Sequence, residues 1–199
     1  MRRALVLIAV GAAALLAGCT TQQFPDPAIS AKDADLLALT PKFARNQDPF
    51  RLRQRMKDTT GQPPGTIVVD SDAKFLYFVE EQGTMLRYEI SVGAQEFTWR
   101  GDANVLRKAE WPQWAPMEEA RKLNPALPKV VTGGPLNPLG ARALYLHDDG
   151  GKDTFIRIHG TNEPEAIGRN VSLGCIRMHN VDVIDLHERV KIGSKVVVR

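Results

Sequence analysis

Two short segments of the chain carry residue types suited to covalent acyl transfer. The first reads Ile-His-Gly-Thr at residues 158–161, and the second reads Ser-Leu-Gly-Cys-Ile-Arg-Met at residues 172–178. A thiol attacks a carbonyl as the thiolate, and a neighbouring imidazole can take its proton. If the fold brings the two segments together, Cys175 is the candidate nucleophile and His159 is the candidate general base.

Glycines and an arginine accompany these two residues. Gly174 permits a tight bend before Cys175, and such a bend leaves backbone N–H groups free to bind the oxyanion of a tetrahedral intermediate. Gly160 allows another group to come close beside His159. Arg177 follows Cys175 by two positions, and its guanidinium is placed to bind a carboxylate through two parallel hydrogen bonds.

Two other uses of Cys175 compete with catalysis. A buried structural cysteine is common, but the histidine, glycine and arginine near this one favour chemistry. A zinc site could draw on Cys175 together with His159, His179 and His187. Only Cys175 and His179 have a ligand-like spacing, and a closed zinc site would occupy the nucleophile. We therefore predict no metal ion and no other cofactor, and we interpret His179 as a loop residue and His187 as a surface helix residue.

The second cysteine, Cys19, has a different setting. Arg2 and Arg3 precede an apolar run over residues 4–15, and Leu-Ala-Gly-Cys follows at residues 16–19. The run is too short for a permanent membrane span, and small residues before a cysteine are typical of a bacterial lipoprotein signal. We predict that residues 1–18 are a lipoprotein signal peptide and that Cys19 is the lipid-attachment residue. An ordinary secretory signal is the alternative.

Either kind of signal places the protein in the cell envelope, on the periplasmic side. The residue after Cys19 is Thr20 rather than aspartate, which resembles proteobacterial signals for the outer membrane rather than the inner one. With Cys19 acylated, Cys175 is a lone thiol in an oxidising compartment, where cysteines usually pair. Its unpaired state favours a chemical role.

Size and charge exclude several classes of function. A chain of 199 residues, 43% hydrophobic and 25% charged, has room for one catalytic domain but not for two large ones. The formal net charge of +3 falls to +1 when Arg2 and Arg3 leave with the signal peptide. Because phosphate binding needs a concentrated basic surface, we expect no nucleic-acid partner.

The rest of the chain changes character at about residue 64. Residues 19–63 contain the lipidated N-terminus, a polar and proline-bearing tether, and an accessory segment of short helices broken at Pro41 and Pro49. The basic residues between 42 and 57 are interpreted as a solvated face, with contact to anionic lipid or peptidoglycan as the alternative.

Residues 64–199 show the pattern of short β-strands. Strands are predicted at residues 66–70, 74–80, 84–92, 141–147, 154–159 and 195–199. Helices are predicted at residues 116–123 and 181–190, the second capped by Asn180. Because both faces of residues 74–80 are largely apolar, the predicted fold class is mainly β, a sandwich or barrel with a few short helices.

The two motif segments resemble the signature of the L,D-transpeptidase catalytic domain, the YkuD-type family. That signature is His-Gly-Thr followed by Ser-x-Gly-Cys-Ile-Arg, with the cysteine sixteen residues after the histidine, as it is here. Pro-Leu-Gly at residues 138–140, Asn-Glu-Pro at 162–164 and Trp-Pro at 111–112 also fit the family pattern. The likeness covers residues 64–199.

The resemblance implies roles for the residues of the two segments. Cys175 would be the acyl-accepting nucleophile and His159 its general base, with the Gly160 carbonyl orienting the imidazole. Gly174 and Cys175 would supply the N–H groups of the oxyanion hole.

Three further residues have implied roles in the same family. Ser172 would support the imidazole or the substrate, Thr161 would contact the substrate, and Arg177 would hold negative charge of the acyl donor and favour the thiolate. Leu173 departs from the pattern, because many members have a second histidine there. The absence of this histidine would remove a proton relay or substrate contact, and it therefore bears on how the acyl acceptor is bound.

The implied substrate is the stem tetrapeptide of peptidoglycan. The enzyme would cleave the bond before the terminal D-Ala, form a thioester on Cys175, and transfer the acyl group to an amine. A diaminopimelate amine would give a 3-3 cross-link, an amine of an envelope protein would anchor that protein to the wall, and water would make the enzyme an L,D-carboxypeptidase. A non-catalytic peptidoglycan-binding lipoprotein is the alternative of another class. The resemblance also implies acylation of Cys175 by carbapenems.

Overall fold

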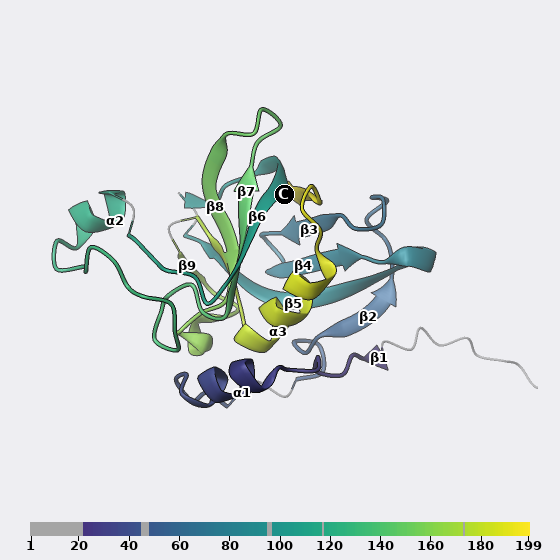
Figure 1. The fold of residues 1–199 in the computed structure, drawn as a ribbon. Coiled ribbons are helices and arrows are strands. Elements are labelled where there is room, and N and C mark those ends of the chain that lie inside the picture. The colour runs from purple at the N-terminus through teal and green to yellow at the C-terminus, as the bar shows by residue number, and fades with distance from the viewer. Residues whose placement is uncertain (1–21, 45–47, 95–96, 117, 173) are drawn as a thin grey trace, which may run out of the picture.

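The computed structural model describes residues 22–44, 48–94, 97–116, 118–172 and 174–199, and its elements are arranged as Figure 1 shows. The predicted signal peptide, residues 1–18, and the predicted lipid-attachment residue Cys19 lie outside the described residues, as does Leu173. The elements in chain order are β1 (Gln22–Gln23), α1 (Ala31–Ala38), β2 (Gln54–Lys57), β3 (Ile67–Asp70), β4 (Phe75–Val79), η1 (Glu81–Gly83), β5 (Thr84–Gly93), β6 (Gly101–Glu110), α2 (Glu118–Leu123), β7 (Arg142–His147), β8 (Asp153–His159), η3 (Pro164–Ala166), β9 (Asn170–Ser172), β10 (Ile176–Met178), α3 (Asn180–Arg189) and β11 (Lys195–Val198).

Eight of the strands close into a barrel. Their order is β5-β10-β8-β7-β6-β11-β3-β4, and the ring closes because β4 also pairs with β5. Strand β10 runs parallel to β8, and β11 runs parallel to β3. The predicted mainly β, barrel-like fold is confirmed.

Side chains that alternate in direction along each strand divide into those that fill the core and those that lie on the outer face of the barrel. Leu144 and Leu146 of β7 and Ile158 of β8 are buried in the main apolar core. Because successive side chains of a strand point to opposite faces, Tyr145 of β7 and His159 of β8 lie on the outer face of the barrel. The strand β6 adds Ala103 and Val105 to the same core. Strand β6 was not predicted from the sequence, because its remaining positions are mostly polar or charged.

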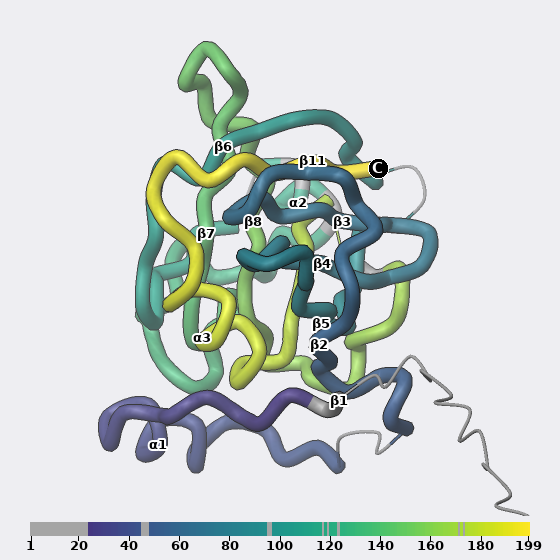
Figure 2. The backbone as a smooth tube through the Cα atoms, turned by 90° about the vertical axis from the view of Figure 1, so that its right-hand side faces the viewer, coloured from purple at the N-terminus to yellow at the C-terminus, as the bar shows by residue number. Residues whose placement is uncertain are grey.

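Helix α3 closes one end of the barrel, and the tube view of Figure 2 shows it beside the strands β7 and β8. Val183 and Leu186 of this helix enter the main core. The predicted helix is therefore confirmed, but the predicted capping role of Asn180 is wrong. The helix begins at Asn180 itself, its N-cap residue is His179, and the side chain of Asn180 bonds to the barrel instead. His187 of α3, expected on the surface, is buried.

The segment before residue 64 is fastened to the barrel rather than free. Strand β2 pairs with β5 along residues 54–57, where the sequence analysis expected helix. Arg53 is 2% exposed, and its guanidinium lies 3.4 Å from the Asp182 carboxylate of α3. The predicted solvated face is therefore wrong for Arg53, whereas the other described basic residues of this segment, Lys42, Arg51, Arg55 and Lys57, are exposed. Basic residues at every second position suit a strand, whose alternate side chains share one face.

The start of the predicted tether is also attached to the barrel rather than free. Strand β1 pairs with β2, with Gln22 opposite Arg55. The Phe24 N–H donates to the Arg53 carbonyl at 3.0 Å, and the Pro25 carbonyl accepts a hydrogen bond from the Arg53 side chain. Residues 22–25 are thus part of the folded body. No helix among the described residues is both long and apolar enough to span a bilayer.

Helix α1 is joined to the barrel through Asp33. Both nitrogens of the Arg142 fork donate to this carboxylate, at 2.9 and 2.8 Å, and the Trp111 indole N–H donates to it at 2.8 Å. All three side chains are buried. Hydrogen bonds from Arg142, from Trp111 and from the Ser30 hydroxyl hold the pKa of Asp33 well below its usual range, although burial opposes this shift.

Replacing Asp33 by asparagine should lower the free energy of unfolding by about 3 kcal/mol, because it leaves a buried guanidinium without its counter-ion. Urea unfolding at neutral pH measures this loss. The control is Asp72→Asn, which breaks an exposed ion pair with Arg100 and should cost less than about 1 kcal/mol. Equal stability of the two variants would contradict a structural role for the Asp33 ion pair.

Candidate active site

The two motif segments lie side by side at the edge between β8 and β10. These strands pair in parallel, with Ile176 opposite Ile158 and Arg177 opposite His159. Cys175 immediately precedes β10, and its Sγ lies 3.8 Å from the Phe155 carbonyl oxygen of β8. The fold therefore places the thiol and the imidazole on the same side of the barrel.

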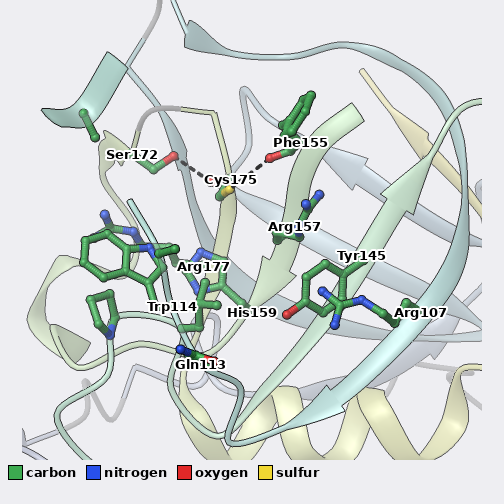
Figure 3. Close-up of a pocket in the computed structure, with 14 residues that line it drawn as sticks. Arg107, Gln113, Trp114, Tyr145, Phe155, Arg157, His159, Ser172, Cys175 and Arg177 are labelled. Carbon is green, nitrogen blue, oxygen red and sulfur yellow. Dashed lines mark hydrogen bonds between the residues drawn. The ribbon is translucent and has the colours of Figure 1, made fainter. Parts of the chain in front are cut away.

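Both side chains line a cleft of about 430 Å³, which Figure 3 shows in close-up. Its floor is the outer face of strands β6, β7 and β8. The long connection between β6 and β7, residues 111–141, forms a wall through Trp114 and Leu139. Apolar walls around a few polar groups are typical of a site that orients a substrate and limits its contact with water.

His159 is 4% exposed, and its Nδ1 lies 2.6 Å from the carbonyl oxygen of Gly160. A carbonyl can only accept, so Nδ1 carries the proton and Nε2 is left with its lone pair. Burial, reinforced by the positive charges of Arg177 and Arg157, lowers the pKa of His159 to about 3. The imidazole is therefore neutral at physiological pH and able to accept a proton.

The side-chain amide of Asn180 joins the turn after this histidine to the backbone at the start of β7. Its Oδ1 accepts hydrogen bonds from the N–H groups of Ala141 and Thr161, both at 3.0 Å, and its Nδ2 donates to the Thr161 carbonyl at 2.8 Å. A Cβ atom on Gly160 would lie 2.1 Å from Asn180 Oδ1, so only glycine fits there. The sequence motif indicated this glycine, but not the asparagine that requires it.

Thr161 has a different setting from the one predicted. It is 1% exposed, and its hydroxyl accepts a hydrogen bond from the Glu163 N–H at 2.9 Å. It is absent from the residues that line the cleft. Its observed contacts hold the turn after β8.

The Cys175 thiol is protonated in this environment. Burial raises its pKa, and this effect outweighs a hydrogen bond from the Arg157 backbone and the positive charges of Arg157 and Arg177. Nearby cationic groups were expected to favour the thiolate, and their effect on the pKa is present but smaller than the effect of burial. Nucleophilic attack from this state requires transfer of the thiol proton to His159.

The turn before Cys175 is held by Ser172. Its hydroxyl donates to the Cys175 carbonyl at 2.6 Å and accepts from the Gly174 N–H at 3.2 Å. Ser172 thus bonds to the turn and not to the imidazole. Gly174 has a φ of +114°, which glycine adopts readily. Since the Gly174 N–H already has a partner, the Cys175 N–H is the remaining candidate from this turn for an oxyanion donor.

Three arginines line the cleft, and only Arg177 was predicted from the sequence. Arg177 donates to the Glu163 carboxylate at 2.8 Å. Arg157 makes two hydrogen bonds of 2.7 Å to Asp153. The third, Arg107, stacks on the ring of Tyr145. Alternation along β8 could have indicated Arg157, because it is two positions from His159 and therefore on the same face.

In the described part of the chain, no group of three or more histidine, cysteine or acidic side chains is arranged to hold a metal ion. The arrangement in the cleft instead combines a protonated thiol, a neutral imidazole with a fixed tautomer, and guanidinium groups. This set is suited to covalent acyl transfer from an anionic donor.

Comparison with known proteins gives the family. Residues 64–198 match the YkuD family, the L,D-transpeptidase catalytic domain, and the chain belongs to this family. It is 32% identical over 138 residues to the probable L,D-transpeptidase YbiS of Escherichia coli, an alignment that covers 66% of this chain and 43% of YbiS. The chain thus spans less than half the length of that relative.

Solved structures agree with the fold. A Brucella melitensis protein described as a probable carnitine operon oxidoreductase is 45% identical, with a TM-score of 0.50 and coverage of 83% of this chain and 99% of that one. An L,D-transpeptidase from Mycobacterium smegmatis has a TM-score of 0.51 at 20% identity, with coverage of 67% and 58%. The second likeness concerns the fold alone.

The buried imidazole should make stability depend on pH. An unfolded histidine titrates near 6.5, whereas the pKa of folded His159 is about 3. Between these values the unfolded chain binds a proton that the folded protein does not, so stability falls as the pH decreases below 6.5. From pH 7.5 to 4.5 this residue should account for a loss of about 3 kcal/mol.

Urea unfolding of the wild-type protein and of His159→Gln at both pH values checks this prediction. Other groups that titrate, including the buried His187, are common to both proteins and cancel in the comparison. An identical pH dependence in the two proteins would show that His159 is not held neutral by the fold.

Proposed function

We propose that the protein is a peptidoglycan L,D-transpeptidase. The observation that carries this proposal is the neutral His159, oriented by the Gly160 carbonyl at 2.6 Å, in one cleft with Cys175. Membership of the YkuD family supports the same reaction. The proposed donor is a stem tetrapeptide whose terminal D-Ala is the leaving group.

In the first half-reaction, His159 Nε2 takes the thiol proton while Cys175 Sγ attacks the carbonyl carbon of the third residue. The oxyanion that forms would be bound by the Cys175 N–H, and the nearby guanidinium of Arg177 would favour the negative charge. The tetrahedral intermediate then collapses to a thioester. The proton on His159 passes to the departing D-Ala amine.

In the second half-reaction an acceptor amine attacks the thioester, and His159 takes a proton from that amine. Collapse of the intermediate forms the new amide and returns the proton to the Cys175 thiolate. A side-chain amine of another stem peptide gives a 3-3 cross-link, and an amine of an envelope protein gives an anchored protein. Water as the acceptor gives an L,D-carboxypeptidase, which uses the same nucleophile and base.

We also propose that the protein is an exported lipoprotein attached through Cys19, on the periplasmic side of the cell envelope, with the outer membrane as its site. The support is the sequence of residues 1–20, namely two arginines, an apolar run, a Leu-Ala-Gly-Cys segment and a following threonine.

The reaction can be tested with a purified disaccharide-tetrapeptide and mass spectrometry of the products. The mature protein should release D-Ala and form a cross-linked dimer, and Cys175→Ala should form neither. His159→Gln should lower the rate of D-Ala release by about 10²-fold to 10⁴-fold, as is typical when a general base is lost. Circular dichroism of both variants provides the control for folding.

Two other outcomes of the same experiment have definite meanings. Release of D-Ala with a tripeptide as the single other product identifies an L,D-carboxypeptidase. Absence both of D-Ala and of a covalent adduct on Cys175, with the peptide or with a carbapenem, leaves a peptidoglycan-binding protein without this activity.

The lipid anchor has a separate test. Cells that express the protein and are grown with labelled palmitate should incorporate the label, and Cys19→Ser should abolish incorporation, whereas Cys175→Ser should not. Label retained in the Cys19→Ser protein would contradict attachment at this residue.

A further inference from the structure

We propose that Arg107 is a specificity residue that binds a carboxylate of the acyl-donor peptide. The inference rests on the proposed function for the identity of the donor. It depends on the position of Arg107 in the sheet, on the ring that supports its guanidinium, and on the charges around it.

Arg107 belongs to a row of side chains that crosses three strands of the cleft floor. Its partner on β7 is Tyr145, and the partner of Tyr145 on β8 is Arg157. The register between β6 and β7 shifts between Val105 and Arg107, which is the signature of a β-bulge. Bulges re-aim side chains and are frequent beside active sites.

The ring of Tyr145 supports the guanidinium of Arg107. The Cζ of Arg107 lies 3.3 Å from the ring centroid, and the Cζ of Arg157 lies 4.6 Å from the same centroid. In Figure 3, Tyr145 and Arg107 overlap beside His159 and Arg157. Stacking against an aromatic face leaves the N–H groups at the edge of a guanidinium available to a ligand.

The charges of the cleft single out Arg107. Arg177 is paired with Glu163, and Arg157 is paired with Asp153. Among the described residues, Arg107 has no ion pair and no side-chain hydrogen bond that would compensate its charge, and it is exposed. Of the three arginines in the cleft, Arg107 is therefore the one whose charge a ligand can neutralise without displacing a protein carboxylate.

The proposed donor offers two carboxylates near the reacting carbonyl. One is at the end of the side chain of the third residue, when this is diaminopimelate, and the other is that of the terminal D-Ala. Neighbouring strands are about 4.8 Å apart, so β6 lies about 10 Å from β8. A long arginine side chain on β6 and either carboxylate of a peptide bound beside Cys175 can meet across this distance.

Three tetrapeptides distinguish the two sources of the carboxylate. The first is unmodified, the second has the side-chain carboxylate of diaminopimelate amidated, and the third has a C-terminal D-Ala amide. The wild-type protein should use one amide about tenfold less efficiently, in kcat/KM, than the unmodified peptide, because a charge-assisted hydrogen bond is lost. The amide that is disfavoured identifies the carboxylate that the cleft recognises, and the Arg107→Met variant tests whether Arg107 is the residue that binds it.

Arg107→Met should remove this discrimination. It should lower kcat/KM for the unmodified peptide about tenfold, mainly through KM, and leave the disfavoured amide nearly unchanged. The matched control is Arg100→Met, which removes the same charge from an exposed residue outside the cleft and should preserve the discrimination. A purely structural role for Arg107 predicts an equal loss on all three peptides, and that result would overturn the proposal.

Binding to Cys175→Ala, measured by calorimetry, tests the same inference without turnover. The unmodified peptide should bind about tenfold more weakly when Arg107→Met is added, and the disfavoured amide should not. If the wild-type protein releases no D-Ala but Arg107→Met still weakens binding selectively, the proposed reaction fails and the carboxylate site stands. Equal binding of the three peptides to the parent Cys175→Ala protein would refute the carboxylate site itself.

Discussion

The side-chain amide of Asn180 is the constraint on which the geometry of the site depends. Its three hydrogen bonds join the first residue of α3 to the start of β7 and to the turn after β8. The amide fits because Gly140 and Gly160 have no Cβ, since a Cβ on either would lie 2.2 Å or less from its oxygen. With the turn held in this way, the Gly160 carbonyl faces Nδ1 of His159. The tautomer of the imidazole therefore follows from the packing of an amide that touches neither the base nor the nucleophile.

Burial determines the protonation of the reacting pair. It lowers the pKa of His159 and raises the pKa of Cys175, so both groups are neutral at rest. The guanidinium groups of Arg157 and Arg177 act on both residues, because positive charge disfavours imidazolium and favours thiolate. A neutral pair avoids the cost of burying two charges in the free protein, and charge develops only while the substrate is attacked. The same guanidinium groups then lie where the negative charge of the bound donor is expected.

The sequence predicted those parts of the protein that local pattern encodes. His159 and Cys175 lie in short motifs of glycine, histidine, cysteine and arginine, and the apolar pattern of the short strands was sufficient to predict a mainly β fold, either a sandwich or a barrel. What it did not predict depends on contacts between distant residues. The buried ion pair of Arg53 with α3 needs the pairing of β2 with β5, and the row that contains Arg107 needs the register of three strands, including β6, which was missed. The raised pKa of Cys175 was also beyond the sequence, because it reflects how much solvent the fold removes.

The attachment of the N-terminal segment to the barrel restricts how a lipid anchor could act. Strand β1 begins at Gln22, three residues after Cys19. Three extended residues span at most about 11 Å, so a lipid on Cys19 would hold the folded body close to the membrane surface while β1 remains paired. In Figure 1, β1 lies at the lower right and α2 at the far left, and α2 contributes Ala120 to the cleft. The distance from the membrane at which such an anchored enzyme works would then follow from the size and orientation of the barrel rather than from the length of a tether.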